Sequence, residues 1–291
     1  MGSLTERFVQ DIDGLSDLPS ISPVLAQLVA TLGREDASVA DVSQIIREDP
    51  VIAARVLRAA NSAAYAGRAP VTSIREALLR LGLARVRRLA LVASLYAAVP
   101  VRGTRAARDA VWRHSLGVAH TAEILARHAT IAPESADPES AFLAGLLHDI
   151  GLLVLESHYP RECAAARRHA LAQQVPLPVA ELAVLAVDHG ELGALLATHW
   201  SLPPSITAAI RSHHKLEAVA PEYRWDVAIV HLADYLVSRE GLGDLQEGSV
   251  AAFDASVYAD LGLTPDAMCD IVTEASAEAR RAAMVLAASI G

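Results

Sequence analysis

An imidazole and a carboxylate stand side by side inside a long apolar stretch of this chain. His148 and Asp149 interrupt the run from Phe142 to Leu155, whose other residues are Phe, Leu, Ala, Ile, Val or Gly. Such a run belongs in a protein interior, where an unpaired ion costs on the order of several kcal/mol or more. The two side chains therefore need partners. Ligation of a metal ion would supply them, and so would a simple His–Asp hydrogen bond at a helix end.

The composition favours helices over strands. Hydrophobic residues make up 53% of the 291 residues and aromatic residues only 4%, so the core has to consist mainly of Leu, Ala and Val. Ala and Leu are strong helix formers, whereas the aromatic residues that favour strands are scarce. We therefore expect an all-α protein.

Charge and cysteine content limit the partners and the compartment. Lys and Arg number 25 against 34 Asp and Glu, a net charge of −9, which argues against general nucleic-acid binding. Cys163 and Cys269 form no CxxC motif and fit a reducing compartment. The polar start, Met1 to Asp13, has no signal-peptide pattern, and the uncharged apolar run Leu89 to Val101 is too short to span a bilayer. We expect a cytoplasmic protein without a membrane partner.

Helix start and stop signals divide the first part of the chain into short helices. After an amphipathic lead-in over residues 1–18, four N-cap signals are expected to start helices: Ser22-Pro23, Ser38, Asp49-Pro50 and Ser73. Gly33 and Gly82 are expected to end helices, and Asn61-Ser62 is expected to form a structural turn. The basic, loop-like residues 101–108 suggest a boundary. We expect an N-terminal bundle over 1–108, a core over 109–240 and a C-terminal extension over 241–291.

Beyond that boundary the histidines gather on longer helices. The apolar periodicity predicts helices over 109–128, across His148-Asp149 to just before Tyr159, and over 161–174, 178–199, 203–214, 226–239 and 265–289. The last of these carries an apolar face. That face can pack on the protein's own core, and it can also form a homodimer.

Seven His and Asp residues on separate helices are the candidate metal ligands: His114, His148, Asp149, His189, His213, His214 and Asp234. Imidazole and carboxylate ligands suit iron, manganese, zinc and other first-row divalent ions. Seven side chains are enough for a dinuclear centre as well as for a single ion. In a dinuclear centre Asp149 could bridge both ions and, in an active enzyme, act as the catalytic carboxylate that positions a water for phosphoester hydrolysis.

Several of these residues also have ordinary structural explanations. His189 lies between Asp188 and Gly190 and could belong to a helix cap, and Asp234 could act on a helix dipole. His213 and His214 are adjacent on a helix and point about 100° apart, so one of them could face solvent.

The motifs together resemble a known family. His114, His148-Asp149 and Asp234 resemble the HD superfamily of metal-dependent phosphohydrolases. Residues 15–220 resemble the HDOD domain, the HD-related output domain of bacterial signalling proteins. The resemblance rests on these passages in this order: Leu18-Pro19, Ser22-Pro23, Asp49-Pro50, Ala60 to Ala63, Ile74 to Gly82, Trp112 to Ser115, Ala141 to Gly151, Glu181, His189 to Gly193, Trp200 to Pro203, and Ile210 to His214.

This resemblance implies a small N-terminal helical bundle packed on an HD-like helical core, but it leaves the activity open. Many HDOD domains have lost HD ligands and act as regulatory modules that bind partners. The additional histidines of this chain resemble the ligands of HD-GYP phosphodiesterases, which cleave cyclic di-GMP with a two-metal centre. Two features depart from HD-GYP. Lys215 to Ala220 contains no Gly-Tyr-Pro element, and Leu152 stands where that pattern has a phosphate-neutralising lysine.

Two functions follow as hypotheses. The first is a signal-transduction protein that binds metal at the retained HD-type site and acts by binding a signalling protein or a nucleotide. The alternative is a metal-dependent phosphohydrolase acting on a cyclic dinucleotide or another nucleotide. Arg85, Arg88 and Arg105 lie in the densest basic zone. They are candidates for a phosphate contact, although a solvated helix face explains them equally simply.

Overall fold

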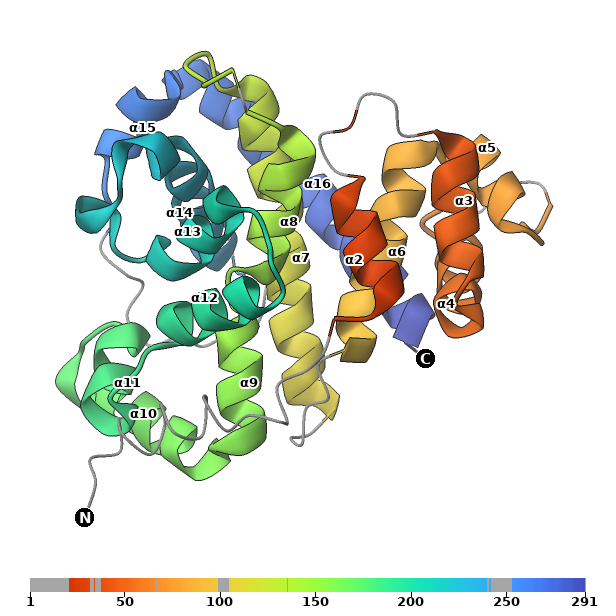
Figure 1. Cartoon of the computed structure of the whole chain (residues 1–291). Coiled ribbons are helices and arrows are strands. Elements are labelled where there is room, and N and C mark those ends of the chain that lie inside the picture. The colour runs from red at the N-terminus through yellow and green to blue at the C-terminus, as the bar shows by residue number, and fades with distance from the viewer. Residues whose placement is uncertain are drawn as a thin grey trace. The chain divides into compact units, whose positions relative to one another are not determined.

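The structure is a computed structural model, and it describes residues 21–31, 34, 38–65, 67, 69–98, 105–134, 136–239, 241 and 253–290. Within these residues the regular secondary structure is helical and no strand occurs (Figure 1). The predicted all-α class is therefore confirmed. The expected lead-in helix over residues 1–18 and the expected stop at Gly33 lie outside the described residues.

The chain divides into two compact units. Among the described residues, those between 105 and 279 belong to the larger unit, and those between 21 and 98 together with 280–290 belong to the smaller unit.

The smaller unit is built from short helices whose starts follow their capping residues. Its helices are α2 (Pro23–Ala30), α3 (Val39–Arg47), α4 (Pro50–Ala60), α5 (Ile74–Leu81) and α6 (Leu83–Ala98). The side chains of Ser22, Ser38, Asp49 and Ser73 accept hydrogen bonds from backbone N–H groups in the first turns of α2 to α5, as predicted. Gly82 ends α5 with a positive φ of 85°. Helix α6 contacts α2, α4 and α5.

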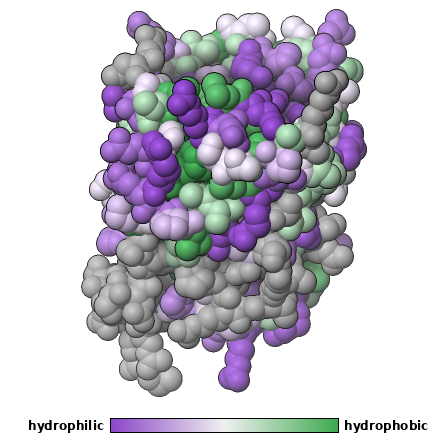
Figure 2. Space-filling model, turned by 90° about the vertical axis from the view of Figure 1, so that its right-hand side faces the viewer, coloured by the Kyte–Doolittle hydropathy of each residue, from purple (hydrophilic) through white to green (hydrophobic). Residues whose placement is uncertain are grey.

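Asn61 forms the turn that follows α4. Its side-chain amide donates to the carbonyl oxygens of Leu57 and Val71 at 2.9 and 2.8 Å, and its side-chain oxygen accepts from the Val71 N–H at 2.7 Å. Asn61 thus has the structural role expected of it. Figure 2 shows one face of the molecule, on which apolar and hydrophilic side chains are mixed. The exposed apolar residues of the smaller unit include Val51 and Leu79.

The larger unit contains the longer helices. Its elements are α7 (Arg105–His128), α8 (Pro138–Leu147), α9 (Ile150–His158), α10 (Pro160–Gln173), α11 (Leu177–Leu185), α12 (His189–His199), α13 (Pro204–Ser212), the 3-10 turns η1 (Leu216–Ala218) and η2 (Pro221–Tyr223), α14 (Arg224–Arg239), α15 (Ser256–Leu261) and the part of α16 (Pro265–Ile290) up to Ala279. Helix α7 packs against α8 and α14, α13 packs against α8, α12 and α14, and α9 packs against α12.

Two helices predicted as continuous are interrupted. The prediction of one helix over 178–199 was wrong. Ala186 adopts a left-handed conformation with φ 61°, which ends α11, and the side chain of Asp188 caps α12. The apolar helix around His148-Asp149 also breaks at that pair, into α8 and α9. The stretch Pro138–His158 is long and apolar enough to cross a membrane, but 89% of its most apolar window is buried inside the protein, so it forms core helices here.

Two glycines let these helices approach closely. A Cβ atom at Gly145 would lie 2.9 Å from the Cα atom of Ala119 on α7, and one at Gly151 would lie 2.0 Å from the carbonyl oxygen of His189 on α12. Side chains larger than hydrogen do not fit at these positions. The close approaches bring the His148-Asp149 break next to α7 and to the start of α12.

Candidate metal centre

The larger unit brings together all seven candidate ligands. His114 comes from α7, His148 and Asp149 from the break between α8 and α9, His189 from the first residue of α12, His213 and His214 from the end of α13, and Asp234 from α14. Each is buried except His214, whose side chain is 12% exposed. A buried cluster of this charge density needs internal compensation.

One group of side chains surrounds one oxygen of Asp149. Asp149 Oδ2 lies 3.3 Å from Nε2 of His148 and 3.8 Å from Nε2 of His114. Asp234 closes the group, because its Oδ1 lies 3.1 Å from Nε2 of His114 and 4.0 Å from Nε2 of His148. We call His114, His148, Asp149 and Asp234 the first group.

A second group surrounds the other oxygen of the same carboxylate. Asp149 Oδ1 lies 3.4 Å from Nε2 of His189 and 3.7 Å from Nε2 of His213. Nε2 of His189 is 3.4 Å from that of His213 and 3.1 Å from that of His214. We call Asp149, His189, His213 and His214 the second group. Their potential ligand atoms lie within 4.8 Å of one another, as do those of His114, His148 and Asp149 in the first group. Asp149 is common to both groups.

Hydrogen bonds to the far side of each ring decide which nitrogen faces the cluster. Nδ1 of His148 lies 2.7 Å from the carbonyl oxygen of Gly145, and Nδ1 of His213 lies 2.8 Å from that of Ile210. A carbonyl oxygen can only accept, so each Nδ1 carries the proton and each neutral ring presents the lone pair of Nε2 to the cluster.

This arrangement leaves acceptor atoms facing one another. His148 Nε2 and Asp149 Oδ2 are 3.3 Å apart, and neither has a hydrogen-bond partner among the described residues. The Asp149 side chain does not cap the following helix either. Asp149 occupies the N-cap position of α9 but makes no side-chain cap bond there. Lone pairs and a carboxylate directed at a common interior point are what a metal cation requires.

The electrostatics of the pocket favour the metal-binding protonation states of Asp149, His213 and His214 but oppose that of His148. Burial lowers the pKa of His213 and that of His214, so both rings are neutral near pH 7. Burial opposes ionisation of Asp149, but the neighbouring histidines, His148 first, hold its pKa well below the usual value. Burial also acts to lower the pKa of His148, but the Asp149 carboxylate outweighs it and raises that pKa. A bound cation would displace this proton.

Two residues outside the predicted set contact two of the candidate ligands, His189 and His213. Oε2 of Glu181 accepts from the backbone N–H of His189 at 2.9 Å and lies 2.7 Å from its Nδ1. Nδ1 of His231 lies 2.7 Å from the carbonyl oxygen of His213. Neither residue was predicted as part of the site. The usable signal for Glu181 is its position as the one charged residue in the apolar sequence of α11. His231 carries no comparable signal.

The predicted phosphate-contact arginines are located elsewhere in the chain. Arg85 and Arg88 lie on α6 of the smaller unit, where the Arg85 guanidinium stands 6.0 Å from the centroid of the Tyr65 ring. The side chain of Arg105 lies outside the described residues. No contact with the seven ligands is therefore described for these arginines.

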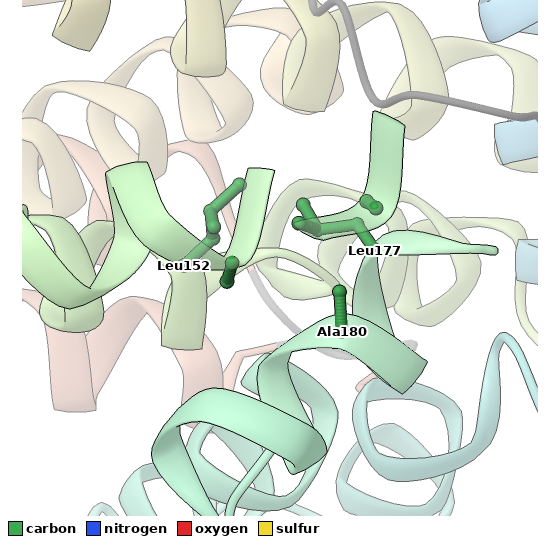
Figure 3. Packing of buried hydrophobic residues seen from close by; sticks show 5 residues of the cluster. Leu152, Leu177 and Ala180 are labelled. Carbon is green, nitrogen blue, oxygen red and sulfur yellow. The ribbon is translucent and has the colours of Figure 1, made fainter. Parts of the chain in front are cut away.

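Leu152 is part of the hydrophobic core. Its side chain packs in a cluster with Ala166, Ala170, Leu177 and Ala180, which joins α9, α10 and α11 (Figure 3). The position at which the HD-GYP pattern has lysine is therefore filled here by an apolar, 1% exposed side chain.

Comparison with known proteins gives the family. The HDOD domain model matches residues 18–216. This chain belongs to the HDOD domain family. It is similar to an HDOD domain protein of unknown function from Geobacter sulfurreducens, with 27% identity, a TM-score of 0.77, and coverage of 97% of this chain and 96% of that one.

Two further relatives extend the comparison. A protein of Shewanella amazonensis described as a candidate phosphohydrolase is 27% identical, with a TM-score of 0.72 and coverage of 97% of both chains. An uncharacterized protein of Treponema pallidum is 26% identical over 225 residues, which are 77% of this chain. The match spans only 43% of the length of that relative.

Proposed function

We propose that this HDOD protein binds two divalent metal ions and uses the loaded centre as the structural core of a cytoplasmic signalling module. The observation that carries the proposal is the position of Asp149, which presents one carboxylate oxygen to each of two histidine groups. Iron, manganese and zinc all accept such imidazole and carboxylate ligands. A pair of such ions supplies Lewis acidity and a nucleophilic water in phosphoester hydrolysis.

A role in binding rather than turnover is favoured by the surroundings of the centre. The ligands are buried, and the most exposed of their side chains, those of Asp234 and His214, are 10% and 12% exposed. Leu152, at the position where the resemblance to HD-GYP proteins implies a charge-neutralising lysine, packs in the hydrophobic core. The neighbouring cation Lys215 is already paired with Asp188. Among the described residues, neither position 152 nor Lys215 therefore supplies a positive side chain for the charge of a phosphoester transition state.

In this role the metals would fix the relative positions of α7, α9, α12, α13 and α14, and the outer surfaces of the module would contact a signalling protein or a nucleotide. Loading would be coupled to stability by mass action, because ions that bind only the folded protein shift the folding equilibrium. The proposal also includes a signalling protein as the partner, a homodimer, and a nucleotide contact through Arg85, Arg88 or Arg105.

The second candidate function is metal-dependent phosphohydrolysis, and one observation favours it. The side chains of all seven candidate ligands lie close together, which a centre with a purely structural role would not require. The candidate phosphohydrolase of Shewanella amazonensis is also similar over nearly the whole chain. In this case Asp149 would be the carboxylate that acts at the reacting centre.

Turnover separates the two functions. Protein reconstituted anaerobically with Mn²⁺ or Fe²⁺ is assayed with bis(p-nitrophenyl) phosphate and with cyclic dinucleotides, beside an Asp149→Asn variant of nearly the same volume. The proposal expects metal-dependent stabilisation without turnover, and thermal stabilisation by a nucleotide would identify a nucleotide-binding module. Turnover that is lost in Asp149→Asn would instead establish the hydrolase. Failure of the wild-type protein to bind either metal would refute both functions.

A further inference from the structure

Glu181 is a buried carboxylate with a specific task. It lies in the middle of α11, where every other residue is apolar, and it is 1% exposed. A buried carboxylate is retained only where it is compensated by hydrogen bonds or opposite charge. Its compensation comes from one residue of the metal centre, His189.

Both bonds to His189 are made by the same carboxylate oxygen. Oε2 accepts from the backbone N–H of His189 at 2.9 Å and from its Nδ1 at 2.7 Å. His189 is the first residue of α12, so its backbone N–H has no partner inside the helix. An ionised carboxylate has no proton to donate, so it acts only as an acceptor. Nδ1 of His189 therefore carries the proton, and Nε2 presents its lone pair to Asp149. Glu181 therefore fixes the backbone, ring orientation and tautomer of His189 together.

His189 differs from His148 and His213 in the partner of its Nδ1 atom. His148 and His213 donate to the neutral backbone carbonyl groups of Gly145 and Ile210, whereas His189 donates to a carboxylate. Charge-assisted hydrogen bonds are roughly twice as strong as neutral ones. A carboxylate acceptor also raises the basicity of a metal-binding imidazole. Nε2 of His189 is therefore the strongest donor among these three rings.

The two groups also differ in their negative charge. The first group contains two carboxylates, Asp149 and Asp234. The second group contains three imidazoles and shares the carboxylate of Asp149. Glu181 adds a second negative charge one hydrogen bond away from the second group. Removing that charge would weaken cation binding at the second group much more than cation binding at the first group.

We infer that Glu181 is the positioning residue of the second group, and that its charge sets the affinity of that group for its ion while leaving the first group largely unaffected. This inference rests on the proposed metal binding. It predicts that the two ions bind as distinguishable sites, and that one substitution outside the ligand set separates them.

The experiment is a titration of the metal-free full-length protein with Co²⁺. Binding is measured by isothermal titration calorimetry and by the visible absorption of bound cobalt. Wild-type protein should bind two ions. Glu181→Gln keeps the size of the side chain and an acceptor oxygen but removes the charge. It should bind one ion with wild-type affinity and the other about 10–100-fold more weakly, with a changed cobalt spectrum for the weakened ion only.

Glu191→Gln is the matched control, because Glu191 is an exposed carboxylate on α12 that pairs with Arg211. This substitution should leave the affinities of both ions unchanged. Circular dichroism establishes that both variants fold. Equal affinities in Glu181→Gln and wild type, or equal weakening of both ions, would overturn the inference. If the wild-type protein binds no cobalt, the proposed metal centre itself is refuted. If the wild-type protein binds two ions and the Glu181→Gln variant binds them equally well, only the role of Glu181 is refuted.

Discussion

Gly151→Ala should disrupt the centre without touching any ligand side chain. A Cβ atom at this position would lie 2.0 Å from the carbonyl oxygen of His189 and 2.7 Å from the backbone nitrogen of Gly193. Cβ atoms essentially never approach other heavy atoms more closely than 3.0 Å, so α9 and α12 would have to separate by about 1 Å or more. The obstructing atoms belong to the backbone of α12 and cannot be relieved by a rotamer change.

The separation acts directly on the two groups. Asp149 immediately precedes α9 and His189 begins α12, so the distance of 3.4 Å between their facing atoms would grow with the separation. Metal–ligand distances tolerate changes of about 0.2 Å, so a shift of about 1 Å should remove His189 from the coordination sphere. Overpacking of a tight interface typically costs about 1–3 kcal/mol, and the backbone contacts place this substitution at the upper end.

The assay is metal stoichiometry by elemental analysis together with urea unfolding of the metal-free protein. Gly151→Ala should lose at least the second ion and about 2–3 kcal/mol of stability. Gly117→Ala is the matched control. It also places alanine in a helix, but the new Cβ would lie 3.2 Å from the side chain of Val237, which can move. Wild-type stoichiometry and stability in Gly151→Ala would refute the close approach of α9 and α12 that positions the site.

Three further outcomes follow from other parts of the chain. Burial raises the pKa of the Cys163 thiol to about 12 while Cys269 is exposed, so one thiol should react with Ellman's reagent at pH 8 in the native protein and two after unfolding; two in the native state would contradict the described packing. Burial raises the pKa of Asp226 in the folded protein to about 6, above its pKa in the unfolded chain. The folded protein favours the protonated carboxyl group, and the stability that this group contributes is lost as the pH rises through 6. Asp226→Asn should therefore gain about 1–2 kcal/mol at pH 7, after discounting for partial exposure, and almost nothing at pH 4 in urea unfolding; equal gains at both pH values would contradict this. Asn61→Ala removes both bonds to Val71 and should cost about 1–3 kcal/mol by the same assay, and a loss below about 0.5 kcal/mol would show that the turn does not depend on them.

The helix starts could be predicted because their causes are local. A capping side chain bonds to backbone groups two or three residues away, so Ser38 and Asp49 identify the starts of α3 and α4 from sequence alone. The division between α11 and α12 could not be predicted in this way. It depends on Ala186 in a left-handed conformation, which alanine adopts only where tertiary packing imposes it. The short helix α15 was missed as well.

The candidate site also has features that could be predicted from the sequence and features that only the structure reveals. The seven candidate ligands were predicted from the residues and from the family resemblance, and the structure places their side chains close together. Their division into two groups depends on which oxygen of Asp149 faces which ring, and no sequence pattern encodes that orientation. The roles of Glu181 and His231 arise from hydrogen bonds across 8 and 18 residues, so they too became visible only in three dimensions.

The most direct test of the metal centre is anomalous X-ray diffraction from crystals of the reconstituted protein, recorded above and below the absorption edge of the added metal. The account predicts two anomalous peaks, one on each side of Asp149. The first should lie among His114, His148 and Asp234, and the second among His189, His213 and His214. Absence of any peak at this cluster under saturating metal, or a single peak that contacts only one oxygen of Asp149, would contradict the dinuclear centre.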